Sequence, residues 1–81
     1  MWLKNNSVFI SLFMETFEIQ GEIILLNQLL KAINWCESGA QANNIIDDGL
    51  VKVNGKVELR KRNKLTKGTI VEFEGNKVKL V

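Results

Sequence analysis

The sequence contains no histidine, no proline and no tyrosine, and its single cysteine is Cys36. Histidine is the most common general base in enzymes, and a cysteine nucleophile needs such a base beside it. The chain also has no Gly-rich phosphate loop, no cluster of metal ligands and no convincing pair of carboxylates. We therefore expect no enzyme, no metal and no cofactor, and we interpret Cys36 as a small apolar filler near the end of a helix.

The single cysteine and the short hydrophobic runs bear on where the protein works. One cysteine cannot form a disulfide within the chain, whereas small domains from oxidising compartments usually carry several bridged pairs. The apolar run at residues 8–14 is far shorter than the roughly 20 residues that span a bilayer. We expect a cytoplasmic protein without membrane association. Residues 1–15 are interpreted as an N-terminal appendage, and Met14 is a candidate for the natural start.

No low-complexity linker and no internal repeat divides the rest of the chain, so residues 16–81 are expected to form one domain. Residues 16–20 alternate apolar and polar side chains, which predicts a half-buried strand closed by Gly21. Ile23 and Ile24 then lead into a helix from about residue 25 to 34. Its apolar stripe has the helical spacing of a core-facing surface. The stripe consists of Leu26, Leu29, Leu30 and Ile33.

A second, short helix is predicted after a break at residues 37–41. Ser38 can accept a hydrogen bond from the first turn of this helix, and Gln41 follows three residues later, as in a capping box. Gly49 marks its end, because glycine readily adopts the left-handed conformation that stops a helix. The two helices are therefore expected to meet at a corner.

Alternating side chains and turn residues predict strands in the remainder of the chain. Residues 50–53 and 56–59 flank Asn54-Gly55, a pair typical of two-residue hairpin turns. Residues 68–73 form another expected strand, which Gly75-Asn76 turns back into residues 77–81. The predicted fold class is α+β, with a short helix pair (an αα corner) packed on a small, mainly antiparallel sheet.

The formal net charge of +2 hides a strong polarity along the chain. Residues 1–50 carry two basic and six acidic side chains, a charge of −4, whereas residues 51–81 carry nine basic and three acidic ones, a charge of +6. Such a basic segment can bind several phosphates, and four to six contacts would give log affinity a slope of about −3 to −5 against log salt. The candidate cations are Arg60, Lys61, Arg62 and Lys64, with Lys52, Lys56 and Lys67 nearby in sequence.

Other basic and aromatic residues have plainer interpretations. Lys77 and Lys79 alternate with apolar residues, as the exposed face of a strand requires. Phe17 and Phe73 fall on apolar strand positions, and Trp35 follows the apolar stripe, where packing at the helix corner is expected. No aromatic platform for stacking bases is visible, so recognition of nucleic-acid backbone and shape is favoured over reading of bases.

Four segments agree in order and spacing with a known family. They are Leu26-Asn-Gln-Leu-Leu-Lys31, Ser38-Gly-Ala-Gln-Ala42, Val51-Lys-Val-Asn-Gly55 and Glu58-Leu-Arg-Lys-Arg62. The chain from about residue 16 to 81 resembles the RNA-binding domain named after ribosomal protein S-four, in particular its stand-alone YbcJ-like branch. This resemblance implies an S-four-like fold and RNA binding.

The resemblance also implies that the two helices and the following turn contribute to RNA contact. The candidates are Ser38, Gln41, Asn43 and Asn44 on the second helix, with Gly49, Asn54 and Gly55 as structural turn residues. Family members commonly carry a lysine where this chain has Asn43, so the second helix lacks positive charge. The two asparagines can donate hydrogen bonds to phosphate or ribose, or can simply make the helix surface polar. Asp47 and Asp48 are expected to limit the contact surface on one side.

The expected activity is therefore non-catalytic binding of structured RNA, such as ribosomal or transfer RNA, by a monomer. The main alternative is a protein-interaction module whose basic edge docks on an acidic partner in a ribosome-associated or RNA-processing assembly. DNA stays open as a ligand, because phosphate contacts do not distinguish the sugars.

Overall fold

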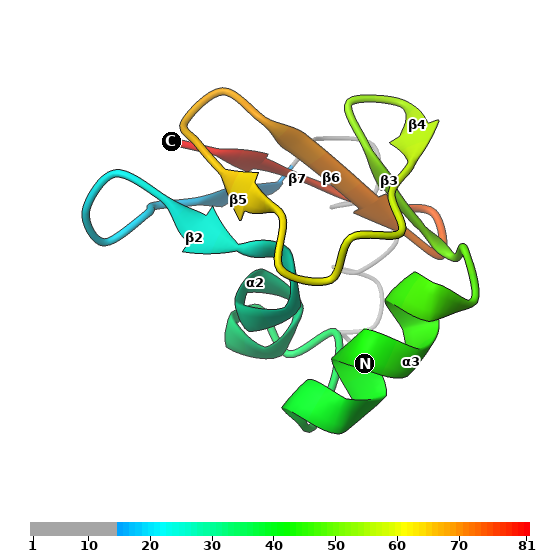
Figure 1. Ribbon diagram of the computed structural model, residues 1–81. Helices are drawn as coiled ribbons and strands as arrows, with labels where there is room; N and C mark the ends of the chain where they lie inside the picture. Colours follow the sequence, from blue (N-terminus) through cyan, green and yellow to red (C-terminus); the bar gives the residue numbers. More distant parts are fainter. Residues whose placement is uncertain (1–14) are drawn as a thin grey trace, which may run out of the picture.

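The computed structural model describes residues 15–81 and forms two layers, a helix pair and a sheet (Figure 1). The predicted appendage, apart from Glu15, and the candidate start at Met14 lie outside the described residues. The elements are β1 (Glu15–Phe17), β2 (Ile24–Leu25), α2 (Leu26–Ala32), α3 (Gly39–Asp47), β3 (Val51–Val53), β4 (Lys56–Val57), β5 (Lys64–Leu65), β6 (Ile70–Phe73) and β7 (Asn76–Leu80).

The main sheet has five strands in the order β1-β7-β6-β3-β4. Its neighbours pair antiparallel except for β1, which runs parallel to β7. Alternation along the strands gives the sheet two different faces: Val71 and Val78 are buried under the helices, whereas Lys52 and Lys77 lie on the outer face, both opposite Glu72. The fold is α+β with a mainly antiparallel sheet, as predicted.

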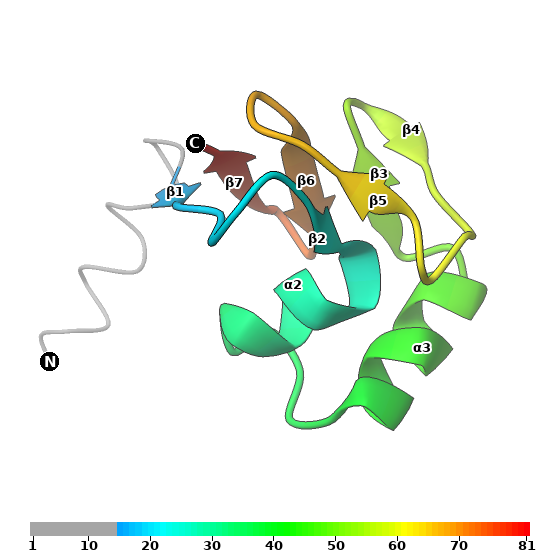
Figure 2. The same ribbon diagram turned by 60° about the vertical axis from the view of Figure 1, so that its left-hand side comes forward.

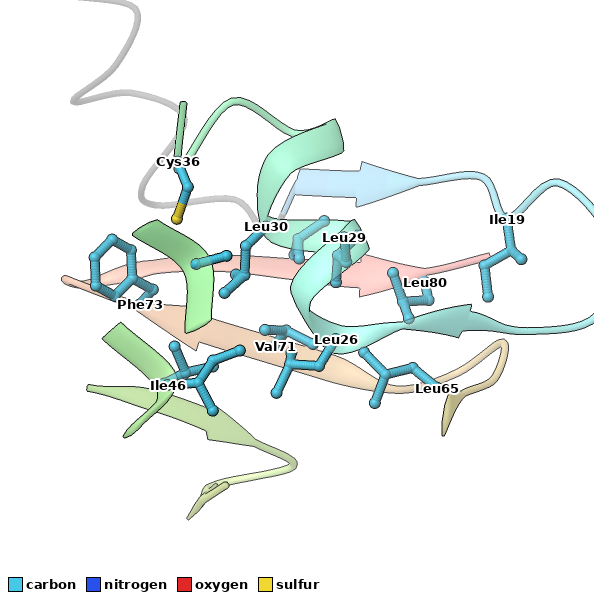
Figure 3. Close-up of a cluster of buried hydrophobic side chains, with 13 residues drawn as sticks. Ile19, Leu26, Leu29, Leu30, Cys36, Ile46, Leu65, Val71, Phe73 and Leu80 are labelled. Carbon is cyan, nitrogen blue, oxygen red and sulfur yellow. The ribbon is translucent and has the colours of Figure 1, made fainter. Parts of the chain in front are cut away.

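The helices close one face of this sheet, and the side chains between the two layers form the core (Figures 2 and 3). Leu26, Leu29 and Leu30 of α2 are fully buried, as the apolar stripe predicted. The helix ends earlier than predicted, at Ala32, because Asn34 has a positive φ of 63°. Neither helix within residues 15–81 is long and apolar enough to cross a membrane.

The corner between the helices is packed by the residues that the sequence assigned to packing. Cys36 is 4% exposed, and burial raises the pKa of its thiol, with a further contribution from nearby Glu74. Trp35 is half-buried, and its ring centroid lies 6.2 Å from that of Phe73. Cys36 therefore belongs to the core, and Trp35 packs against it. The interpretation of Cys36 as a small apolar filler is confirmed.

The start of α3 has the predicted Ser38 cap, but Gln41 accepts from the amide one residue before the one that a capping box requires. Ser38 Oγ accepts a hydrogen bond from the Gln41 amide at 3.1 Å, and the Gln41 side chain accepts one from the Glu37 amide at 2.7 Å. The first bond satisfies an amide group that the first helical turn leaves without a partner, and the second ties the preceding residue to the helix start. The helix ends before Gly49, whose φ of 77° is the expected left-handed stop.

We expect Ser38→Ala to lower the free energy of unfolding by about 1 kcal/mol, because the Gln41 amide loses its acceptor. Chemical denaturation with circular dichroism measures this change. Ser38→Asp, which keeps an acceptor at the cap, should be nearly as stable as the native protein. Equal stability of the alanine variant would contradict this account of the cap.

Several details of the strands differ from the sequence prediction. β1 ends at Phe17 rather than at residue 20, β4 ends at Val57 rather than at residue 59, and β6 begins at Ile70 rather than at residue 68. The turn between β6 and β7 consists of Glu74 and Gly75, which have φ values of 53° and 82°, and Asn76 already pairs with Phe73. The turn was thus predicted one residue too late. In addition, Ile24 leads into α2 as predicted, but with Leu25 it also forms a strand that the sequence did not predict: β2 pairs antiparallel with β5 in a separate two-stranded sheet.

Candidate nucleic-acid interface

The basic run lies in the connection between β4 and β5, which we call the basic loop (residues 58–64). It follows the Asn54-Gly55 hairpin, whose turn residues have the predicted positive φ values of 52° and 86°. The last residue of the loop, Lys64, belongs to β5 and pairs with Leu25. The basic residues therefore lie next to the start of α2, beyond the hairpin edge on which the sequence placed them (Figure 1).

The backbone of the basic loop caps the N-terminus of α2. The amide of Leu26 donates to the Asn63 carbonyl at 2.9 Å, and the amide of Asn27 donates to the Lys61 carbonyl at 3.0 Å. The first amides of a helix have no partner within it, so carbonyls from another segment stabilise the helix start. This contact places the basic side chains beside α2, although the two segments are more than 30 residues apart in sequence.

A carboxylate lies at the base of this positively charged loop. Glu58 accepts hydrogen bonds from the Arg60 amide (2.9 Å), Arg60 Nε (2.9 Å), Arg60 Nη2 (3.2 Å) and Asn63 Nδ2 (3.2 Å). The Glu58 side chain is only 14% exposed, whereas that of Arg60 is 76% exposed. The hydrogen bonds from Arg60 hold the pKa of Glu58 below its ordinary value, and the same contact raises the pKa of Arg60.

The four cations of the loop fall into two groups. Arg60 pairs with Glu58, and Lys61 Nζ lies 3.2 Å from the carboxylate of Asp47 at the end of α3. Arg62 and Lys64 form no ion pair with any residue in the range 15–81, and both are exposed. The acidic end of α3 thus limits the basic surface, as predicted, and Arg62 and Lys64 are the loop cations most available to an anion.

Arg62 also joins the loop to the helix pair. It lines an open hollow of about 250 Å³ together with residues from both helices. The other lining residues are Leu25, Asn27, Gln28, Lys31 and Gly39. Lys31 lies in the last turn of α2 and was not among the predicted binding residues. Only the docking of the loop on α2 reveals that it shares a hollow with Arg62.

Most polar candidates on α3 have partners inside the protein. Ser38 and Gln41 cap the helix, and Asn43 Oδ1 accepts a hydrogen bond from Asn27 Nδ2 at 3.0 Å. Asn43 therefore ties the two helices together, which gives it a structural role. Asn44 is exposed and makes no such contact within the described part of the chain.

The remaining predicted lysines are not gathered at the basic loop. Lys56 lies on the hairpin, and Lys67 lies in the turn between β5 and β6; Figures 1 and 2 place this turn and the hairpin tip on the side of the sheet away from the helices. Lys52, like Lys77, lies opposite Glu72 on the outer face of the sheet. The structure thus brings Arg60, Lys61, Arg62 and Lys64 together and separates them from the other three.

Comparison with known proteins identifies the family. The family model described as "S4 domain" matches residues 17–81. YbcJ of Escherichia coli (strain K12) and YbcJ of Shigella flexneri are each 52% identical over 56 residues, which is 69% of this chain and 80% of each relative.

The solution structure of YbcJ from E. coli superposes with a TM-score of 0.63 and 46% identity, over 84% of this chain and 87% of that one. That structure is described as revealing an ALFAL motif involved in RNA binding. The resemblance inferred from the sequence is confirmed: this chain belongs to the S4 domain family.

Proposed function

We propose that this protein binds structured RNA without catalysis, through the basic loop and the adjoining face of α2. The observation that carries this proposal is the docking of the loop on the helix start, which presents Arg62 beside Lys31. Lys64 lines a second hollow together with residues 59–63 of the loop. The structure of the related YbcJ, which is described as revealing a motif involved in RNA binding, supports the same conclusion.

The ligand class follows from the chemistry of the surface. Guanidinium and ammonium groups bind phosphate oxygens, and arginine can do so with two parallel hydrogen bonds. The aromatic side chains Phe17, Trp35 and Phe73 belong to the core or pack against it and offer no platform for stacked bases. Recognition therefore depends on backbone and shape, which suits folded RNA such as ribosomal or transfer RNA.

Fluorescence anisotropy with a labelled RNA hairpin, titrated at several salt concentrations, tests the proposal. If Arg62, Lys64, Lys61 and Lys31 engage phosphates, log affinity should fall against log salt with a slope of about −3 to −4. A DNA duplex of the same sequence serves as the comparison, because its helix differs in shape. Absence of binding to any structured RNA at low salt would refute the proposal.

A second candidate function is docking on an acidic protein surface of a ribosome-associated or RNA-processing assembly. The observation in its favour is the exposure of Leu50, Val57 and Leu59, each more than half exposed along the segment that leads into the basic loop. Exposed apolar side chains mark a protein interface where they form one patch rimmed by polar residues. Partners that a tagged protein retains after nuclease digestion would favour this function over RNA binding.

The remaining parts of the proposal concern cellular setting and assembly. Cys36 is a buried free thiol, in keeping with a reducing compartment such as the cytoplasm. We propose that the protein acts there as a monomer, because one basic loop docked on one helix pair provides a complete contact surface.

A further inference from the structure

Glu58 carries a negative charge into the middle of the surface that we propose binds RNA. Taken alone, such a charge repels phosphate and weakens binding. We infer that Glu58 instead strengthens RNA binding, an inference that rests on the proposed function. Glu58 acts as a positioning residue, because it holds the basic loop in the shape that binds RNA.

The hydrogen bonds of Glu58 close the loop on itself. One carboxylate oxygen accepts from both the amide and Nε of Arg60, and the other accepts from Arg60 Nη2 and Asn63 Nδ2. The Asn63 amide in turn donates to the Arg60 carbonyl at 3.1 Å. A segment with four cations among five residues would otherwise extend to reduce their repulsion. The carboxylate counters this repulsion and fixes a compact turn.

Both ends of the closed loop are attached to the fold. The Glu58 amide donates to the Val51 carbonyl of β3 at 3.0 Å, and the Asn63 carbonyl accepts from the Leu26 amide at the start of α2. Glu58 therefore links the sheet to the helix through the loop. The Arg62 side chain reaches the hollow that it shares with Lys31 only while residues 61 and 63 keep these contacts with α2.

In this arrangement Arg60 and Arg62 have different roles. The guanidinium of Arg60 donates hydrogen bonds from Nε and Nη2 to Glu58, so Arg60 mainly stabilises the shape of the loop. Arg62 has no carboxylate partner among residues 15–81 and is the arginine that binds phosphate. The salt dependence separates the two roles. Loss of a phosphate contact changes the slope of log affinity against log salt, whereas loss of a contact inside the loop does not.

The test compares Glu58→Gln with Glu74→Gln, which removes the same charge from the turn between β6 and β7. RNA affinity is measured by fluorescence anisotropy at several salt concentrations. We expect Glu58→Gln to weaken binding about tenfold with an unchanged salt slope, because the same cations still bind phosphate in the complex and the loss is the cost of ordering a loop that is no longer preorganised. Glu74→Gln should bind as tightly as the native protein or slightly tighter.

The two arginine variants supply the second readout. Arg62→Gln should lower the steepness of the salt slope by about 1, as expected for one lost phosphate contact, whereas Arg60→Gln should weaken binding with the slope preserved. If Glu58→Gln does not fold, as judged by circular dichroism, Asn63→Ala replaces it, because it removes one contact of Glu58 and leaves the pair with Arg60. The same loss of affinity is then expected.

The outcomes distinguish this inference from the function on which it rests. Native protein that binds RNA, together with a Glu58→Gln variant that binds equally or more tightly, would overturn the role of Glu58 alone. Native protein that binds no RNA would overturn the proposed function first.

Discussion

Replacing both Arg62 and Lys64 by glutamate is expected to reduce affinity for structured RNA by about 100-fold or more. Hydrogen bonds to charged groups are worth about 1.5–3 kcal/mol each, so two lost contacts alone account for about this factor, and the new charges add repulsion. Both side chains are exposed and have no ion pair within residues 15–81, so the fold should survive the change. Filter binding at low salt measures the loss.

The choice of residues follows from the contacts inside the loop. A glutamate at position 60 would face the carboxylate of Glu58 and disturb the loop, so its effect on binding would be indirect. The matched control is Lys67→Glu with Lys79→Glu, which makes the same charge change at two exposed residues that face no carboxylate across the sheet. This control should weaken binding by less than about tenfold, through long-range repulsion only. Equal losses in the two double variants would contradict a localised site.

The largest expected effect on stability is that of Leu30→Ala, which should lower the free energy of unfolding by about 2–5 kcal/mol. Leu30 is fully buried between α2 and the sheet, together with Leu29 and Val71 (Figure 3). Truncation removes buried apolar atoms and leaves a cavity that the surrounding side chains fill only in part. Urea denaturation followed by circular dichroism measures the change.

Leu50→Ala is the matched control, because Leu50 is 52% exposed and leaves no cavity. Its effect should stay within about 0.5 kcal/mol. Similar losses for the two variants would mean that the packing of α2 on the sheet does not hold the fold together.

The sequence predicted those parts of the fold that depend on local rules. The leucine spacing of α2, the Ser38 cap, the Gly49 stop and the Asn54-Gly55 hairpin all depend on residues close to one another along the chain. Side-chain alternation likewise assigned Lys77 and Lys79 to the exposed face of a strand, where both lie.

The details that were missed depend on contacts between distant segments. β2 and β5 are two residues long and show no alternation, so only their pairing defines them as strands. The capping of α2 by the carbonyls of residues 61 and 63 uses the backbone, which leaves no mark on side-chain composition.

For the candidate site, the sequence predicted the basic run but not the contacts that its side chains make with one another. Glu58 belonged to a family segment, yet nothing in one sequence indicated that its side chain would turn back onto Arg60 and Asn63. Proximity along the chain also grouped Lys67 with the run, although the intervening strand β5 carries the chain away from it. Lys31 was missed for the opposite reason, since it approaches Arg62 only in the folded protein.

The central claim is that RNA binds at the basic loop and the adjoining face of α2. The most direct test is a titration of ¹⁵N-labelled protein with a structured RNA, followed by amide chemical shifts. The account predicts the largest shifts at residues 58–64 and 25–31, with little change on β7. Largest shifts on the outer face of the sheet, or no shifts at any residue, would contradict it.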